Sequence, residues 1–111
     1  MIRGAVYQVT IGDAKGRRGH EQSGKRYAVV VSPSNMPWSV VTIVPTSTSA
    51  QPTVFRPLVD FDGRPTRVLI DQIRSIDTQY VGEQVGYLTR DEMAEVEHAM
   101  ASYLGIIPLA E

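Results

Sequence analysis

The sequence predicts a small, mainly β protein, a β-barrel of five or more short strands with one C-terminal helix packed on it. Two observations predict this fold class. Short apolar runs rich in β-branched residues, separated by turn-forming residues, occupy most of the chain up to about residue 76. The last part of the chain instead has apolar residues at helical spacing, between a capping pattern and a glycine.

The length and composition narrow the class of protein further. The chain has 111 residues, which is enough for one small core, so we expect a single domain over residues 1–111. Apolar residues make up 42 % and charged residues 21 %, which excludes a disordered tail and a fibre. The net charge of −1 excludes a uniformly basic surface but allows a local basic patch.

Several kinds of chemistry are excluded by what the sequence lacks. It contains no cysteine, which removes disulfides, thiolate catalysis and Cys-ligated zinc. Its two histidines, His20 and His98, are far apart in the sequence, so we expect no metal and no cofactor. No apolar run reaches the roughly 20 residues of a membrane span, and the first residues enter a strand-like pattern without a signal sequence. We therefore expect a cytoplasmic protein with no membrane contact.

The first three strands are predicted from the apolar pattern. Residues 5–9 alternate and are rich in β-formers. Residues 26–32 and 38–44 are largely continuous apolar runs, which are typical of strands buried on both faces. Pro45 is expected to end the third strand, because proline cannot donate a hydrogen bond to a sheet.

The second half of the chain predicts two more strands. Residues 54–59 form a weaker pattern that contains Pro57, which favours an edge strand. The pair Asp62-Gly63 is typical of a tight hairpin turn. Residues 66–76 then predict one further strand, bent at Asp71.

A helix is predicted over residues 89–104. Thr89 and Glu92 match a capping box, and Gly105 is a natural C-terminal stop. Apolar residues recur at helical spacing on one face, which we expect to pack on the barrel. They are Met93, Val96, Met100, Tyr103 and Leu104.

A long polar loop, residues 11–25, carries a cluster of positive charge. It contains four glycines, and loops of this length in small domains are usually functional or disordered. Five of the eleven basic residues lie in it or next to it, together with His20; they are Lys15, Arg17, Arg18, Lys25 and Arg26. Two interpretations remain open: a strip that binds phosphates, and a solvated loop that is charged for solubility.

A second candidate feature is the hydroxyl cluster Thr46-Ser47-Thr48-Ser49, which follows a buried strand. Such a cluster can form an ordinary turn. Its hydroxyls can also donate hydrogen bonds to a phosphate oxygen. Composition alone leaves both interpretations open.

Four segments in the right order resemble the MazF/PemK toxin family, and together they cover nearly the whole chain. The first contains Arg3-Gly4 with Tyr7, followed by the run from Gly19 to Ser32. The remaining three are Val44-Pro45-Thr46-Ser47-Thr48, then Leu69-Ile70-Asp71-Gln72-Ile73-Arg74-Ser75-Ile76, and finally Val85-Gly86-Tyr87-Leu88 with the closing helix.

The resemblance implies an SH3-like barrel of the MazF/CcdB type. It also implies a homodimer that acts as a sequence-specific, metal-independent endoribonuclease toxin. Such a toxin cleaves single-stranded RNA to 2′,3′-cyclic phosphate and 5′-OH ends. A cognate antitoxin protein would hold it inactive.

By the same resemblance, the catalytic residues are Arg26, Ser47 and Glu21. Arg26 would stabilise the negative charge at phosphorus, Ser47 would donate to a non-bridging oxygen, and Glu21 would accept the proton of the 2′-OH. A register shift of one residue moves the role of Ser47 to Thr48, and His20 is the alternative base. The residues expected to contact RNA are Lys15, Arg17, Arg18, His20, Gln22, Lys25, Thr48, Ser49 and Gln72.

Other interpretations of the same barrel remain open. A CcdB-type toxin has this architecture without catalysis and would bind a protein target such as DNA gyrase. A degenerate barrel would act only as a binding module. Arg26 could instead be a strand-start arginine paired with Asp71 or another carboxylate. The sequence also departs from the family at Tyr27, where proline is usual, and this restores a backbone N–H next to Arg26.

Overall fold

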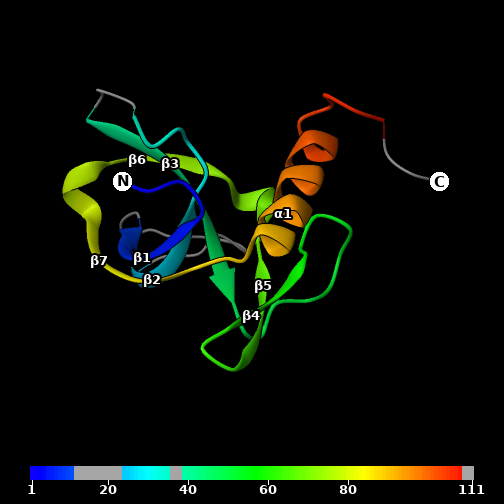
Figure 1. The fold of residues 1–111 in the computed structure, drawn as a ribbon, viewed down its shortest axis with the longest axis horizontal. Helices are drawn as coiled ribbons and strands as arrows, with labels where there is room; N and C mark the ends of the chain where they lie inside the picture. The colour runs from blue at the N-terminus through cyan, green and yellow to red at the C-terminus, as the bar shows by residue number, and fades with distance from the viewer. Residues whose placement is uncertain (12–23, 36–38, 109–111) are drawn as a thin grey trace.

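The computed structural model describes residues 1–11, 24–35 and 39–108. Within them, the predicted fold class is confirmed: the chain is mainly β and closes with a helix (Figure 1). The strands are β1 (Ala5–Ile11), β2 (Gly24–Val30), β3 (Val40–Ser47), β4 (Leu58–Phe61), β5 (Arg64–Val68), β6 (Arg74–Asp77) and β7 (Val81–Tyr87). Two short 3-10 turns, η1 (Ile70–Gln72) and η2 (Thr78–Tyr80), flank β6, and the helix is α1 (Arg90–Tyr103).

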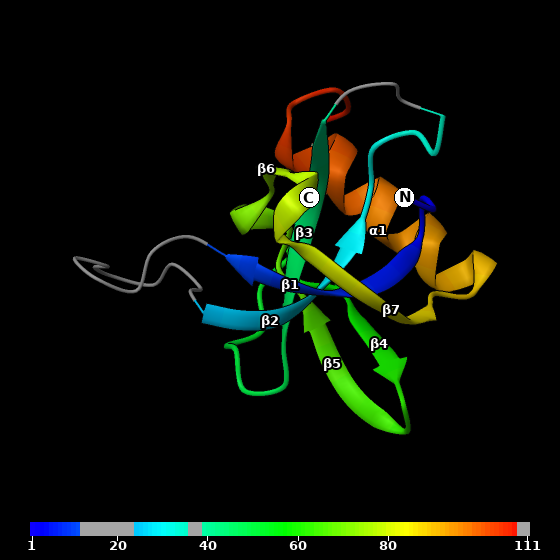
Figure 2. The same ribbon diagram turned by 90° about the vertical axis from the view of Figure 1, so that its left-hand side faces the viewer.

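The strands form one antiparallel sheet that curls into a half-barrel. Their order is β4-β5-β3-β2-β1-β7, and β6 pairs with β3 outside this path. Figures 1 and 2 show α1 lying against one side of the curled sheet, with the β4–β5 hairpin extending away from the other strands.

Strand β3 is shared between two sets of partners. Along one edge it pairs with β2, and along the other it pairs first with β6 (residues 40–43) and then with β5 (residues 46–47). The prediction that Pro45 ends this strand is therefore wrong. The Pro45 carbonyl accepts a hydrogen bond from Leu69 N at 2.8 Å, and its nitrogen faces the same edge, between the β6 and β5 pairings. The missing N–H therefore costs the sheet no ladder bond.

Two other strand predictions need correction. The strand predicted at 54–59 begins only at Leu58, after Pro57, although it does lie at the edge of the sheet. The strand predicted at 66–76 is divided into β5 and β6 by η1, in place of a bend at Asp71.

Strand β7 was not predicted. Most of its residues are exposed, so the strand lacks the apolar alternation that marks the others. It also contains Gly82 and Gly86, which read as turn residues. It pairs with β1 through an irregular register.

The expectation that β2 and β3 are buried on both faces is confirmed for their central residues, whereas Arg26, Tyr27 and Val40 are exposed. Ala28, Val29 and Val30 have no exposed surface, and they point alternately into two core clusters. One cluster, which includes Val29 and Val44, packs under α1. The other, which includes Ala28 and Ile43, lies on the opposite face of the sheet with Tyr7.

The predicted capping box of α1 is confirmed. Thr89 Oγ1 accepts from Glu92 N at 3.1 Å, and Glu92 Oε1 accepts from Thr89 N at 2.9 Å. The other Glu92 oxygen accepts from Asp60 N of β4 at 2.9 Å, which ties the start of the helix to the hairpin. Gly105 has a φ of 74°, as expected for a helix stop.

The buried face of α1 agrees with the prediction only in part. Val96 and Ala99 are buried, and Met93 and Met100 pack beside them. The two residues at the end of the predicted face, Tyr103 and Leu104, are instead 40 % and 54 % exposed. No helix in the described part of the chain has the length and apolar character to cross a membrane.

Candidate functional site

A pocket of about 280 Å³ lies where four strands of the sheet meet. Its walls come from β1, β2, the end of β3 and the start of β5. The lining residues are Gln8, Arg26, Tyr27, Thr46, Ser47, Thr48 and Arg64. The structure therefore brings together Arg26, Ser47 and Thr48, which the sequence places about twenty residues apart.

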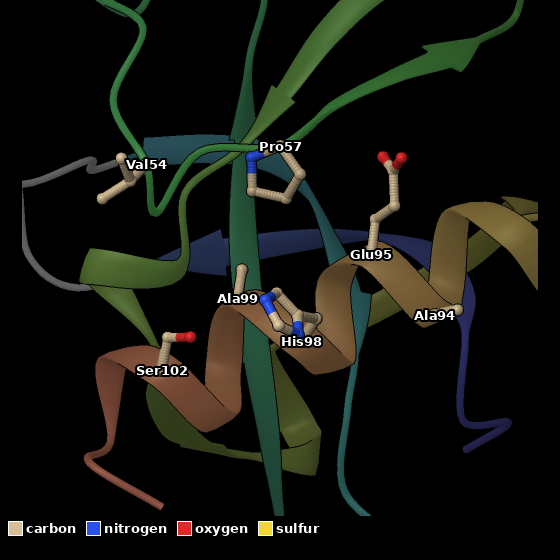
Figure 3. A pocket seen from close by; sticks show the side chains of 7 residues that line it. All are labelled: Val54, Pro57, Ala94, Glu95, His98, Ala99 and Ser102. Atoms are coloured by element: carbon tan, nitrogen blue, oxygen red, sulfur yellow. The ribbon is translucent and has the colours of Figure 1, made fainter. Parts of the chain in front are cut away.

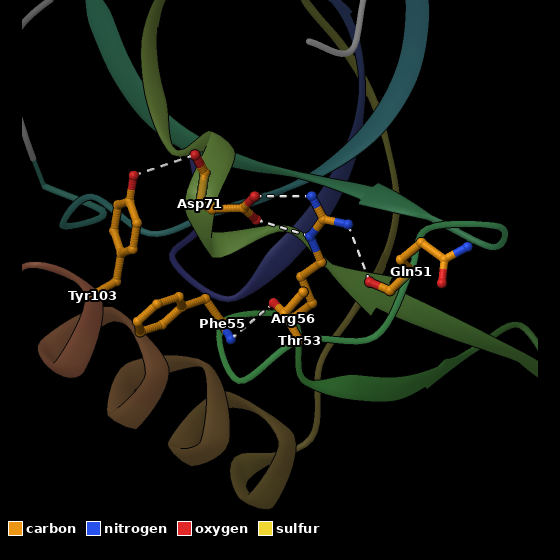
Figure 4. Close-up of polar contacts among 6 residues, drawn as sticks. All are labelled: Gln51, Thr53, Phe55, Arg56, Asp71 and Tyr103. Atoms are coloured by element: carbon orange, nitrogen blue, oxygen red, sulfur yellow. Dashed lines mark hydrogen bonds and ion pairs between the residues drawn. The ribbon is translucent and has the colours of Figure 1, made fainter. Parts of the chain in front are cut away.

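Arg26 is an exposed residue of β2, paired with Val9 of β1. Its predicted alternative role, an ion pair with Asp71, is wrong, because Asp71 is bound by Arg56. Arg56 Nε donates to Asp71 Oδ1 at 3.0 Å and Nη2 donates to Oδ2 at 2.9 Å (Figure 4). Among the described residues, no carboxylate forms an ion pair with the Arg26 guanidinium.

The three hydroxyl residues of the pocket play different roles. Thr46 is buried, and its hydroxyl donates to the Tyr27 carbonyl at 2.9 Å, so it fastens β3 to β2. Ser47 Oγ accepts from Ser49 N at 3.1 Å and lies 3.5 Å from Ser49 Oγ, so its hydroxyl takes part in a local turn at the edge of the pocket. Thr48 is exposed and also faces the pocket. Both candidates for the catalytic hydroxyl therefore line it.

Sequence reasoning missed three residues of this pocket: Gln8, Tyr27 and Arg64. Gln8 stands opposite Tyr27 in the β1–β2 register, and Arg64 follows the hairpin turn. Only strand pairing brings Gln8 and Arg64 close to Arg26, and no spacing in the sequence indicates this proximity. With Arg26 and Arg64 in its walls, the pocket presents two guanidinium groups to an anion.

Several predicted site residues lie outside the described part of the chain. They are the catalytic candidate Glu21, the side chain of Lys25, and the predicted RNA contacts Lys15, Arg17, Arg18, His20 and Gln22. Gln72 lies in η1 and Ser49 follows β3, and neither of them lines the pocket.

Another cavity, of about 460 Å³, lies between α1 and the segment before β4 (Figure 3). Its walls include Val54 and Pro57 on one side and Ala94, His98 and Ala99 of the helix on the other. It is larger than the pocket at Arg26, but it contains no arginine or lysine. In the described part of the chain, no cluster of three or more His, Cys, Asp or Glu is arranged to hold a metal ion.

The family is decided by comparison with known proteins. The model for the PemK-like, MazF-like toxins of type II toxin–antitoxin systems matches residues 2–104. The chain belongs to this family. A protein of Mycobacterium tuberculosis strain H37Rv that is proposed to be a toxin is 66 % identical over 107 residues, which cover 96 % of this chain and 99 % of that protein.

Solved structures of MazF toxins share the fold. The crystal structure of MazF from Deinococcus radiodurans has a TM-score of 0.78 and 28 % identity, and the match covers 95 % of this chain and 96 % of that one. A mycobacterial endoribonuclease in complex with its cognate antitoxin has a TM-score of 0.79 and 21 % identity over 99 % of both chains. The expected small SH3-like barrel of the MazF type is thus confirmed.

Proposed function

We propose that this PemK/MazF-family toxin is an endoribonuclease that cleaves single-stranded RNA at specific short sequences without a metal ion. The observation that carries this proposal is the meeting of Arg26 with Ser47 and Thr48 in one open pocket. A guanidinium beside hydroxyl donors suits a phosphate better than an apolar ligand. The fold shared with a mycobacterial endoribonuclease supports the same reaction class.

In the proposed reaction, the ribose 2′-oxygen attacks the adjacent phosphorus. The new bond joins O2′ to phosphorus, and the bond from phosphorus to O5′ breaks. The 2′-OH proton passes to a base, and the leaving O5′ takes a proton from a general acid or from water. The products are a 2′,3′-cyclic phosphate and a 5′-OH end.

Arg26 is proposed to stabilise the negative charge that grows on the non-bridging oxygens as this bond forms. Its planar guanidinium can bind two oxygens at once, and it stays charged at any physiological pH. Ser47, or Thr48 if the register is shifted by one residue, donates to one of the same oxygens. Glu21 is proposed as the base with His20 as the alternative, and both lie outside the described residues.

The proposed assembly is a homodimer controlled by a cognate antitoxin. Large apolar side chains remain exposed after the end of α1, including Leu104 at 54 % and Ile106 at 72 %, and a second copy would cover them. The arginines of the pocket are proposed to bind RNA phosphates. Carboxylates of an antitoxin segment carry the same negative charge and would compete for them. The mycobacterial neighbour is in complex with its own antitoxin.

One assay tests the proposed activity. Purified protein is incubated with a long unstructured RNA in the presence of EDTA, and new 5′-OH ends are labelled with a kinase without prior phosphatase treatment. Discrete labelled fragments are expected from the natural protein and from Arg90→Ala, a control that removes an exposed arginine outside the pocket. If the RNA stays intact, the proposed activity is wrong, and binding to a protein target becomes the better proposal.

A further inference from the structure

A second cavity adjoins the pocket at Arg26. It has a volume of about 390 Å³, within the range of small-ligand sites, and lies between β2 and the β4–β5 hairpin. We call it the hairpin hollow. It shares Tyr27, Thr46, Thr48 and Arg64 with the pocket at Arg26, so the two form one continuous groove.

The hairpin hollow has an aromatic wall. The Tyr27 ring lies against Phe61 of β4, with ring centroids 5.6 Å apart and planes inclined by 58°. Phe61 in turn lies on the bare backbone of Gly86, where an added Cβ would come within 3.1 Å of the Phe61 ring. Tyr27 itself is 44 % exposed and lines the hollow, so part of the residue is open to a ligand.

The position of this wall is fixed by the elements around it. The Tyr27 carbonyl is held by the buried Thr46 hydroxyl, and the chain at Tyr27 is paired with Gln8 of β1. Flat aromatic surfaces that are held in place in this way stack on nucleobases, and each base stacked on such a ring typically gains about tenfold or more in affinity.

The rim of the hairpin hollow carries two groups of opposite hydrogen-bonding character. Asp62 and Gly63 form the two-residue turn of the hairpin, with φ values of 54° and 78°, and Asp60 Oδ1 pins the turn by accepting from Gly63 N at 2.9 Å. The Asp62 carboxylate can only accept hydrogen bonds, whereas the Arg64 guanidinium can only donate them. Both side chains line the hollow.

We propose that the hairpin hollow binds the base of a nucleotide next to the cleaved phosphate and selects a base with an exocyclic amino group over uracil. This proposal rests on the proposed endoribonuclease function. A nucleotide whose phosphate lies at Arg26 has its neighbouring base within the same groove, against Tyr27. The Asp62 carboxylate accepts from the amino group of cytosine, adenine or guanine, while uracil would turn a carbonyl oxygen toward it.

Asp62→Asn is the decisive variant. After glycine, asparagine and aspartate are the residues that adopt a positive φ most readily, so the substitution keeps the turn. Its amide can donate as well as accept, so it can satisfy uracil. Asp91→Asn, at an exposed carboxylate in the first turn of α1, is the matched control.

The cleavage arm uses short RNAs that contain the mapped cut site and differ by one base beside it. For the natural protein and Asp91→Asn, uracil at one flanking position is expected to lower kcat/KM at least about tenfold, and Asp62→Asn should remove most of that difference. Tyr27→Leu should weaken binding at the same position through a higher KM, since the stacking face is lost. If the protein cleaves RNA with a base preference that neither Asp62→Asn nor Tyr27→Leu changes, the proposed subsite is wrong and the endoribonuclease function still stands.

The binding arm is independent of cleavage. Fluorescence anisotropy measures the affinity of uncleavable 2′-deoxy oligonucleotides of equal length that contain only cytosine or only uracil as bases, so no mapped cut site is needed. The natural protein should favour cytosine, and Asp62→Asn should bind both equally. Equal binding of both by the natural protein would overturn the proposal. If RNA is never cut but the base preference in binding is present and sensitive to Asp62, the subsite is supported while the proposed reaction fails.

Discussion

Arg56 donates hydrogen bonds to both carboxylate oxygens of Asp71, at 3.0 and 2.9 Å, and so joins the segment before β4 to the turn η1 (Figure 4). The same arginine donates to the Gln51 carbonyl at 3.1 Å, and the Tyr103 hydroxyl lies 3.4 Å from the Asp71 backbone oxygen. The Tyr103 ring also packs edge-on against Phe55. One half-buried ion pair therefore connects the loop after β3, the turn η1 and the end of α1.

Replacing Arg56 by alanine should destabilise the protein by about 1–3 kcal/mol. The pair is less exposed than a surface salt bridge, and Asp71 would lose two charge-assisted hydrogen bonds. Urea unfolding of Arg56→Ala and of the exposed control Arg90→Ala measures the difference. If Arg56→Ala loses no more free energy of unfolding than Arg90→Ala, water satisfies Asp71 as well as Arg56 does, and the ion pair does not stabilise the fold.

Stability should fall in acid, in part through Asp71. The hydrogen bonds from Arg56 lower the pKa of Asp71 below its ordinary value. For Glu92, burial raises the pKa, but hydrogen bonds from the backbone N–H groups of Thr89 and Asp60 outweigh it and lower the pKa overall. Both groups thus stabilise the fold above their unfolded pKa of about 4, and this contribution is lost as the pH falls through the lower folded values.

Asp71→Asn isolates one of these two contributions. The variant should be less stable than the natural protein at neutral pH, and its free energy of unfolding should change less between about pH 5 and pH 2. Denaturant titrations across that range provide the measurement. Parallel curves for the two proteins would contradict the assignment to Asp71.

Arg26→Ala should lower the rate of RNA cleavage about 10²–10³-fold, the usual cost of losing one fixed donor to a developing anion. Arg26→Lys should restore little, because a point charge cannot bind two oxygens in the manner of a guanidinium. Single-turnover cleavage of a short RNA measures both. Cleavage by Arg26→Ala at the natural rate would remove the catalytic role from this residue.

Ser47→Ala should slow cleavage about two- to tenfold, since a neutral hydroxyl makes a weaker hydrogen bond than a guanidinium. Affinity for an uncleavable 2′-deoxy oligonucleotide should change less than the rate does, if the contact strengthens in the transition state. Thr48→Ala is the matched variant, because both hydroxyls line the pocket. If Thr48→Ala slows cleavage and Ser47→Ala does not, the catalytic hydroxyl is that of Thr48.

Light scattering at micromolar concentration should show a dimer. Ile106→Asp, which places a charge on the exposed apolar surface after α1, should shift the protein toward a monomer. Leu58→Asp, at a residue of the edge strand β4 that is 49 % exposed, should not. A natural protein that is monomeric at this concentration would contradict the proposed assembly.

Much of the fold could be predicted, because its strongest signals are local. The apolar runs in β2 and β3 and the capping box at Thr89 each depend on residues within a few positions of one another. Pro45 and β7 could not be predicted for a common reason. Whether a proline breaks a strand depends on which edge its nitrogen faces, and β7 exists because β1 offers it an edge.

The candidate site was predictable in part. The basic cluster with Arg26 and the hydroxyl cluster with Ser47 stand out in the sequence, the family resemblance assigned a role to each residue, and the structure places both in one pocket. Arg64 carries no local signal, because its approach to Arg26 depends on β5 pairing with the end of β3. Gln8 is likewise brought in only by the register of β1 on β2.

The β4–β5 hairpin joins β3 at only two residue pairs, Thr46 with Val68 and Ser47 with Arg67, and its tip at Asp62 and Gly63 is open to water. Side chains that accept the positive φ of this turn can be exchanged there during evolution with little effect on the barrel, whereas Arg26 lies in β2 next to fully buried residues. If the tip reads the RNA, descendants of one ancestral toxin can acquire new target sequences by drift in a few surface positions. New RNA targets can then arise while the proposed catalytic residues stay the same.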